Sequence, residues 1–232
     1  MDKSFIQAFL KTSSGLNDLG KKLTWEIPAS ADKHKGDLGL LPEDINIGAW
    51  QVPTSTAQLL RFLILITKSK TILELGTSIG FSTIWLALGA KENGGHVYGT
   101  EIFPEKAKLA KKHFEEAGVS DQVTLLEEDI LDVLKNWKNE QKIDFVFMDA
   151  DKQRYDQYLE KLLPIMNDNA LIAVDNVGNY PEHMQPFLEK CTSMEGITVH
   201  FLNIDFGVLL ILKNPNANIF NKDNFIYNAQ RI

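Results

Sequence analysis

The chain has 232 residues, of which 44% are hydrophobic and 24% charged, and its formal net charge is −7. This balance is typical of a soluble globular protein of one or two domains, and no apolar run approaches the roughly 20 residues that a helix needs to cross a bilayer. The acidic charge, without any basic block, disfavours broad binding of nucleic acid, and the single cysteine, Cys191, excludes an internal disulfide and a cysteine-rich metal cluster.

The first 50 residues hold a short amphipathic stretch and then an irregular segment rich in Pro, Gly and Asp, "PASADKHKGDLGLLPEDINIG". The apolar part of the N-terminus is too short and too interrupted by charge for a signal peptide, so we expect a cytoplasmic protein without a membrane partner. Residues 54–67, "TSTAQLLRFLILIT", place apolar side chains at helical spacing behind a Ser/Thr N-cap and predict a helix.

From Thr71 onward, short apolar runs alternate with amphipathic segments of helical length. The apolar runs cover residues 71–75, 96–101, 122–127, 143–149 and 170–175. Strands of this kind separated by helices are typical of a parallel sheet covered on both faces, and right-handed crossovers favour a doubly wound α/β topology.

Two more apolar runs, 197–204 and 207–213, are separated by a short turn and predict an antiparallel hairpin at one edge of the sheet. We therefore predict a single domain over 1–232, with an N-terminal helical and irregular cap (1–50), a core (51–213) and an Asn-rich tail (214–232). The tail is either a loosely ordered terminus or an arm that packs on a partner subunit. In the second case the contacts would come from Phe220, Phe225 and Tyr227.

Ligands of doubly wound sheets bind outside the carboxyl ends of the strands. The first strand ends in "LELGTSIGFS", in which Gly76 and Gly80 form G-x-x-x-G rather than the dinucleotide pattern G-x-G-x-x-G. A structural turn explains these glycines as well as a ligand does. Glu74, inside the strand, is costly to bury without a partner, and a bound cationic amine would be one.

The next two strand ends carry acids in the order that a nucleoside requires. Glu101 is placed to accept both hydroxyls of a ribose, although a solvated acid at a helix start explains it equally well when taken alone. Glu128, Asp129 and Ile130 follow the third strand, where adenine contacts would lie. Together the three strand ends indicate a nucleoside ligand.

The fourth and fifth strands end at Asp149 and at Asp175 with Asn176. Adjacent parallel strands lie about 4.8 Å apart, so these oxygens converge if the two strands are neighbours. Carboxylate and amide oxygens suit a hard divalent cation such as Mg²⁺. The alternative is that Asp149 caps the next helix and that Asp175 and Asn176 form a turn.

The motifs "LELGTSIGFS", Glu101, "FVFMDADKQRYDQY" and "LIAVDNV" resemble those of class I S-adenosylmethionine-dependent O-methyltransferases. The similar group is the cation-dependent caffeoyl-CoA and catechol O-methyltransferase type, and the resemblance covers roughly residues 45–212. It implies a mainly parallel seven-stranded sheet with the last strand antiparallel, S-adenosylmethionine as cofactor, a divalent cation (Mg²⁺ first, with Mn²⁺ or Ca²⁺ as alternatives) and a homodimer.

The resemblance also implies roles for individual residues. It gives Asp149, Asp175 and Asn176 as metal ligands, and Lys152 as the catalytic base beside Asp149. The implied cofactor contacts are Val52, Glu74, Gly76, Thr77, Ser82, Glu101, Ile130 and Asp151.

The implied reaction moves a methyl group from the sulfonium donor to a hydroxyl of a small vicinal dihydroxy aromatic, a small phenolic substrate. Two adjacent hydroxyls can chelate the metal, which favours the phenolate and fixes one oxygen on the methyl axis. A lysine kept from water could take the proton. Lys152 could equally be a solvated lysine at the start of a helix.

The chain departs from the family after Val177, where "GNYPEHMQPF" replaces a tryptophan-glycine loop. Our hypothesis for the acceptor pocket is therefore Trp50, Asn179 and Tyr180. Three other functions stay open: methylation of a hydroxylated nucleoside in tRNA, disfavoured by the net charge; a nicotinamide-dependent oxidoreductase, disfavoured by the missing G-x-G-x-x-G; and a catalytically silent nucleoside-binding protein, disfavoured by the complete acid-amide set.

Overall fold

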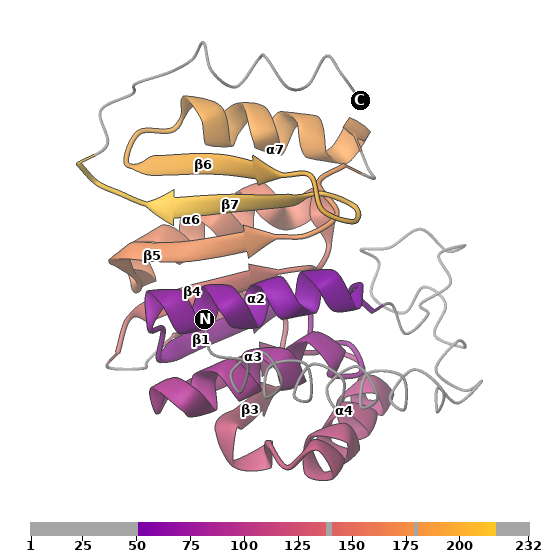
Figure 1. The fold of residues 1–232 in the computed structure, drawn as a ribbon. Helices are drawn as coiled ribbons and strands as arrows, with labels where there is room; N and C mark the ends of the chain where they lie inside the picture. Colours follow the sequence, from indigo (N-terminus) through magenta and orange to yellow (C-terminus); the bar gives the residue numbers. More distant parts are fainter. Residues whose placement is uncertain (1–50, 138–140, 179–180, 217–232) are drawn as a thin grey trace.

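A computed structural model describes residues 51–137, 141–178 and 181–216 of the chain (Figure 1). The predicted cap, 1–50, and most of the predicted tail, with Phe220, Phe225 and Tyr227, lie outside the described residues. Within the described residues, no helix is both long and apolar enough to cross a membrane.

Seven strands form one sheet in the order β3-β2-β1-β4-β5-β7-β6. The strands are β1 (Thr71–Leu75), β2 (His96–Thr100), β3 (Val123–Leu126), β4 (Ile143–Met148), β5 (Met166–Val174), β6 (Ile197–Leu202) and β7 (Val208–Lys213). The first five pair in parallel, whereas β7 runs antiparallel to both β5 and β6. This confirms the doubly wound α/β fold, the hairpin at one edge and the antiparallel last strand.

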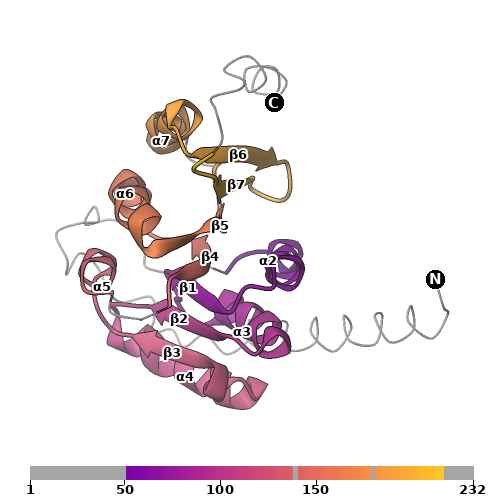
Figure 2. The ribbon, with the colours of Figure 1, turned by 90° about the vertical axis from the view of Figure 1, so that its left-hand side faces the viewer.

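Helices cover both faces of the sheet. They are α2 (Thr54–Thr67), α3 (Phe81–Asn93), α4 (Pro104–Ala117), α5 (Ile130–Lys135), α6 (Tyr155–Ile165) and α7 (Pro181–Ser193), with two short 3-10 helices, η2 (Ser120–Gln122) and η3 (Lys152–Arg154). Seen end-on, α2 and α3 lie on one side of the sheet and α5, α6 and α7 on the other (Figure 2).

The apolar strands explain this three-layer arrangement, because successive side chains point to opposite faces. Phe145 and Phe147 of β4 pack into a core with residues of α2, α3 and α4. Val146 and Met148, between them, pack into a second core with residues of α6 and α7. Since both faces are buried, the sheet can bind a polar ligand only at its edges or strand ends.

Two details differ from the sequence analysis. Helix α2 begins at Thr54 after Pro53, and no side chain caps it. The predicted Ser/Thr N-cap is wrong because the hydroxyls of Ser55 and Thr56 donate instead to Asp205, in the turn between β6 and β7. Strand β5 begins at Met166, before the predicted residue 170, and its pairing with β4 shifts register there.

Candidate active site

Glu74, the acid at the end of β1, is completely buried. Its carboxylate accepts hydrogen bonds from Thr77 Oγ1 (2.9 Å), from Ser82 Oγ (2.6 Å) and from the hydroxyl of Thr83. Burial raises the pKa of Glu74 to about 7, and the three hydroxyls oppose that rise. Hydroxyls of the chain therefore fill the role that the sequence analysis gave to a bound amine, and Glu74 as a cofactor contact stays a prediction.

Gly76 brings the end of β1 against the end of β4. Its φ is +98°, and a Cβ there would lie 2.2 Å from the carbonyl oxygen of Asp149. Its N–H donates to Thr100 Oγ1 (3.1 Å), and that hydroxyl donates to the carbonyl of Glu74 (3.1 Å). Only glycine fits here, because any side chain would push apart two loops that carry predicted ligand contacts.

Glu101 lies directly after β2 and is only 8% exposed. The backbone N–H of Phe103 donates to its carboxylate (2.9 Å). Burial raises the pKa of Glu101, whereas backbone N–H groups, including that of Ser78, and the nearby Lys106 lower it. A solvated acid at a helix start does not describe this side chain, so the alternative reading of Glu101 is wrong.

The third strand end carries a different arrangement. Asp129 caps α5 by accepting from the N–H of Leu131 (2.8 Å), and it also binds Arg154. Ile130, the first residue of α5, is partly buried. Asp151, in the turn after β4, caps η3 by accepting a hydrogen bond from the N–H of Gln153 (3.1 Å). Both acids thus shape the turns at this edge, and Ile130 and Asp151 as cofactor contacts stay predictions.

Asp149 and Lys152 form an ion pair at the end of β4, with Nζ 3.3 Å from Oδ1 and side-chain exposures of 23% and 14%. The ammonium also lies 5.7 Å from the centre of the Tyr155 ring. Lys152 is therefore not a solvated lysine, and Asp149 does not cap the following helix. Sequence reasoning missed Tyr155, whose buried hydroxyl lies 3.2 Å from the N–H of Ala150, although its position after "DADK" was a usable signal.

Asp175, at the end of β5, is 1% exposed, and within the described part of the chain neither of its carboxylate oxygens has a hydrogen bond of normal geometry. Burial, with a further contribution from the negative charge of Asp149, raises the pKa of Asp175 to about 7. Strands β4 and β5 are paired neighbours, with Met148 opposite Val174. The structure therefore places the two predicted carboxylates at the ends of neighbouring strands, close enough for their charges to interact.

The residues present here fit a divalent cation. A bare buried carboxylate beside a second one is unfavourable unless a positive charge joins them. The described residues hold no group of three His, Cys, Asp or Glu side chains suited to a metal. Asn176 follows Asp175 with φ +58° and offers an amide oxygen. This all-oxygen set matches the preference of Mg²⁺.

Asp205 is a second residue that sequence reasoning missed. It accepts from Ser55 Oγ (2.5 Å) and Thr56 Oγ1 (2.7 Å), and its charge adds to the rise in the pKa of Asp175. The turn that carries it also binds the chain after Asn176, because the N–H of Gly178 donates to the carbonyl of Phe206 (2.9 Å). An acid in the short turn between two apolar runs was the available signal.

The remaining predicted residues are buried or lie outside the described chain. Val52 is buried in the core beside α2, and Thr77 and Ser82 are bound to Glu74 as described. Trp50, Asn179 and Tyr180, the hypothetical acceptor pocket, lie outside the described residues.

Known proteins include similar sequences and similar folds. The family model described as O-methyltransferase matches residues 43–190. The chain is 34% identical to a catechol O-methyltransferase of Niastella koreensis over 56% of this chain and 59% of that protein. It is 38% identical to a catechol O-methyltransferase of Mycobacterium tuberculosis over 53% of this chain and 56% of that one. The matches therefore span less than two thirds of these curated relatives.

Among solved structures, the O-methyltransferase from Bacillus cereus in complex with SAH is similar with a TM-score of 0.70 and 25% identity. The similarity covers 87% of this chain and 91% of that one. With its seven-stranded sheet and its match to the family model over most of the core, the chain belongs to the O-methyltransferase family, in the class I S-adenosylmethionine-dependent group that includes the caffeoyl-CoA and catechol enzymes.

Proposed function

We propose that this protein transfers a methyl group from S-adenosylmethionine to one hydroxyl of a small vicinal dihydroxy aromatic, with a divalent metal at the acceptor site. One observation carries the proposal: Asp175 is buried with both oxygens unpaired within the described chain, next to Asp149 and its partner Lys152. A site that only stabilised the fold would pair these oxygens internally.

The donor fits the ends of β1 to β4. Glu101 is a buried acid directly after β2, placed to accept ribose hydroxyls, and the turn around Gly76 lets a ligand approach the backbone closely. Ile130 and Asp151 are two further donor contacts that the resemblance implies. Acids near the amine and ribose of a sulfonium compound also offset its positive charge.

Asp149, Asp175 and Asn176 would hold the metal, which, when bound, supplies positive charge that favours an ionised acceptor oxygen. Lys152 Nζ lies 3.3 Å from Asp149 Oδ1, and the neutral form of its amine would receive the proton of the acceptor hydroxyl. The Lys152 side chain is only 14% exposed, so water is largely excluded from its amine. The bond to the methyl carbon then forms as the bond from that carbon to sulfur breaks.

The acceptor class is supported by two relatives named as catechol O-methyltransferases. Methylation of tRNA is less well supported because the chain has a net charge of −7. The expectations of a homodimer and of a cytoplasmic location stay predictions.

The test is a methyl-transfer screen with labelled S-adenosylmethionine over catechol, a caffeoyl ester, phenol and bulk tRNA, each with Mg²⁺ and with EDTA. We expect transfer to catechol with Mg²⁺, at least about 100-fold less with EDTA, and none to phenol, which lacks the second hydroxyl. Transfer to tRNA but not to catechol, or undiminished transfer in EDTA, would refute the proposal. Calorimetry with NADH against S-adenosylmethionine separates the oxidoreductase alternative.

A further inference from the structure

Arg154 joins two strand ends that are not neighbours in the sheet. Its two terminal nitrogens bind the two carboxylate oxygens of Asp129, with Nη1 2.6 Å from Oδ2 and Nη2 2.7 Å from Oδ1. We call this pair the Asp129–Arg154 bridge. Two parallel N–H···O bonds between opposite charges combine attraction with a fixed geometry, so the pair sets both distance and orientation.

The bridge is shielded compared with an ordinary surface ion pair. The Arg154 side chain is 14% exposed and that of Asp129 is 29% exposed. The guanidinium also lies 5.5 Å from the centre of the Tyr158 ring. Arg154 lowers the pKa of Asp129, chiefly by hydrogen bonding, and Asp129 raises that of Arg154. Both carboxylate oxygens of Asp129 are thus taken up by Arg154, leaving this acid poorly suited to bind a nucleoside amine directly.

Each end of the bridge holds a turn at the candidate site. Asp129 caps α5, whose first residue is Ile130. Arg154 closes the turn after β4, because its N–H donates to the carbonyl of Asp151 (3.1 Å). Lys152 lies inside that closed turn and reaches back to Asp149. The bridge therefore connects Ile130 to Asp151, which are both predicted cofactor contacts, and connects both to Lys152, the predicted base.

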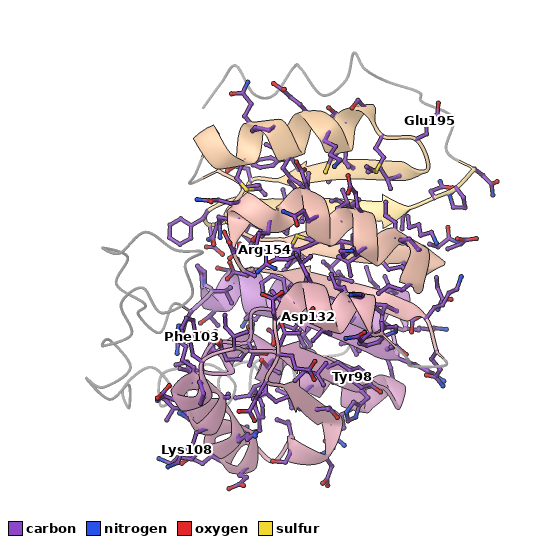
Figure 3. All side chains as sticks on the ribbon, turned by 180° about the vertical axis from the view of Figure 1, so that it is seen from behind. Tyr98, Phe103, Lys108, Asp132, Arg154 and Glu195 are labelled. Carbon is purple, nitrogen blue, oxygen red and sulfur yellow. The ribbon has the colours of Figure 1, made fainter. Side chains whose placement is uncertain are left out.

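The sheet itself cannot supply this connection. Strands β2 and β1 lie between β3 and β4, which separates the two ends by roughly 14 Å. Helices α5 and α6 contact each other on one face of the sheet, and Arg154 lies where α6 begins, near the α5 residue Asp132 (Figure 3). A long cationic side chain at this place spans the gap beside the expected donor.

We propose that Arg154 is a positioning residue, which acts through Asp129 to hold Ile130, Asp151 and Lys152 at the spacing that the methyl donor requires. The inference rests on the proposed function and adds to it the fixed distance between the donor and the base. Misplacement of a reacting group by about 1 Å can cost about 100-fold in rate, so even partial loosening of this turn has a measurable effect.

The test compares Arg154→Gln, Asp129→Asn and the double variant with Lys190→Gln, a matched control. Lys190 binds Glu160 at 2.6 Å between α7 and α6, away from the strand ends. The readouts are the Kd for S-adenosylhomocysteine by calorimetry, kcat and KM with catechol, and Tm. If Arg154→Gln does not fold, Arg154→Lys replaces it, because lysine keeps the charge and loses the two parallel bonds.

We expect Arg154→Gln and Asp129→Asn each to weaken S-adenosylhomocysteine binding and to lower kcat about tenfold, with the double variant no worse than either alone. Lys190→Gln should stay within about twofold of the wild type in both. If the bridge variants lower Tm but leave Kd and kcat within about twofold of the wild type, the bridge is merely structural. That result overturns this inference and leaves the proposed function standing. If the wild-type protein does not bind S-adenosylhomocysteine, the proposed function fails and takes this inference with it.

Discussion

The end of β1 and the neighbouring ends of β4 and β5 each bury an acid, and the surroundings of the two acids differ. Glu74 and Asp175 are both acids at buried strand ends, and burial raises the pKa of each to about 7. Glu74 accepts three hydroxyl hydrogen bonds from its own loop. Asp175 has no such bonds within the described chain and instead faces the charge of Asp149.

The difference separates an acid held by hydroxyls of its own loop from an acid whose oxygens accept no hydrogen bond within the described chain. A carboxylate that accepts hydrogen bonds from three hydroxyls has most of its lone pairs satisfied by the chain itself. The Asp175 carboxylate, whose oxygens accept no hydrogen bond within the described chain, keeps its cost of burial until a cation binds, and the relief of that cost favours cation binding. The predictions below test this difference, beginning with the largest expected effect.

Replacing both Asp149 and Asp175 with Ala should lower catechol methylation at least about 1000-fold, because the predicted metal ligands are lost. The fold should survive, since the change removes two carboxylates that repel each other. Mg²⁺ should raise the Tm of the wild type and leave that of the variant unchanged, because a ligand stabilises only the protein that binds it. Kinetic assays and thermal melts with and without Mg²⁺ measure both effects.

The matched control is Asp168→Ala, which removes an exposed acid at the opposite end of β5, where it pairs with Lys213 at 3.2 Å. It should retain both activity and the rise in Tm with Mg²⁺. If Mg²⁺ raises the Tm of the double variant as much as that of the wild type, the ion binds elsewhere. The proposed difference between the two strand ends is then wrong.

The positions of the strands along the chain and the polar residues that follow them could be predicted from the sequence, because both follow from local patterns. The apolar run at 71–75 is β1 as predicted, and Asp149 and Asp175 converge as expected from adjacent parallel strands. What could not be predicted is pairing between distant side chains. Ser55 binds Asp205, 150 residues away, and no local signal indicates that the Ser/Thr cap of α2 is taken up elsewhere.

The same limit applies to Glu74 and Arg154. The sequence indicated that Glu74 needed a partner, but not that hydroxyls from Thr77, Ser82 and Thr83 would supply it, since the loop and the start of α3 must fold back for this. The Asp129–Arg154 bridge depends on the side-by-side packing of α5 and α6, which only the folded sheet produces.

Lys152→Met tests the cation that is paired with Asp149. Methionine keeps the length of the side chain and removes its amine, so we expect kcat to fall about 100-fold, as for the loss of a general base. KM for S-adenosylmethionine should change less than about threefold, because Lys152 contacts Asp149 and Tyr155 rather than the predicted donor residues. Steady-state kinetics of the variant and the wild type from pH 6 to 9 measure both parameters. If the variant has the same rate as the wild type across that range, Lys152 is not the base.

The smallest expected effect concerns Glu74, and it appears in stability rather than in activity. The folded protein holds the Glu74 proton to about pH 7, whereas the ordinary value is 4.5. Between these values the folded state binds more protons than the unfolded state, so the free energy of unfolding falls as the pH rises. Glu74→Gln, which mimics the protonated form, should lose this contribution and become more stable than the wild type by up to about 3 kcal/mol at pH 8, with little difference at pH 5.

Urea unfolding in EDTA at pH 5 and pH 8 measures the Glu74 contribution. Asp175 adds a slope of the same sign, from its ordinary value of 3.8 to about 7, so the comparison needs Asp175→Asn as a parallel variant. Each variant should remove only its own share of the pH dependence. Added Mg²⁺ should affect the two contributions to the pH dependence of unfolding differently. The contribution of Asp175 should shrink, because a bound cation keeps that carboxylate ionised, and the contribution of Glu74 should persist. If Mg²⁺ instead reduces the Glu74 share equally, the acid at the end of β1 is not a purely structural one.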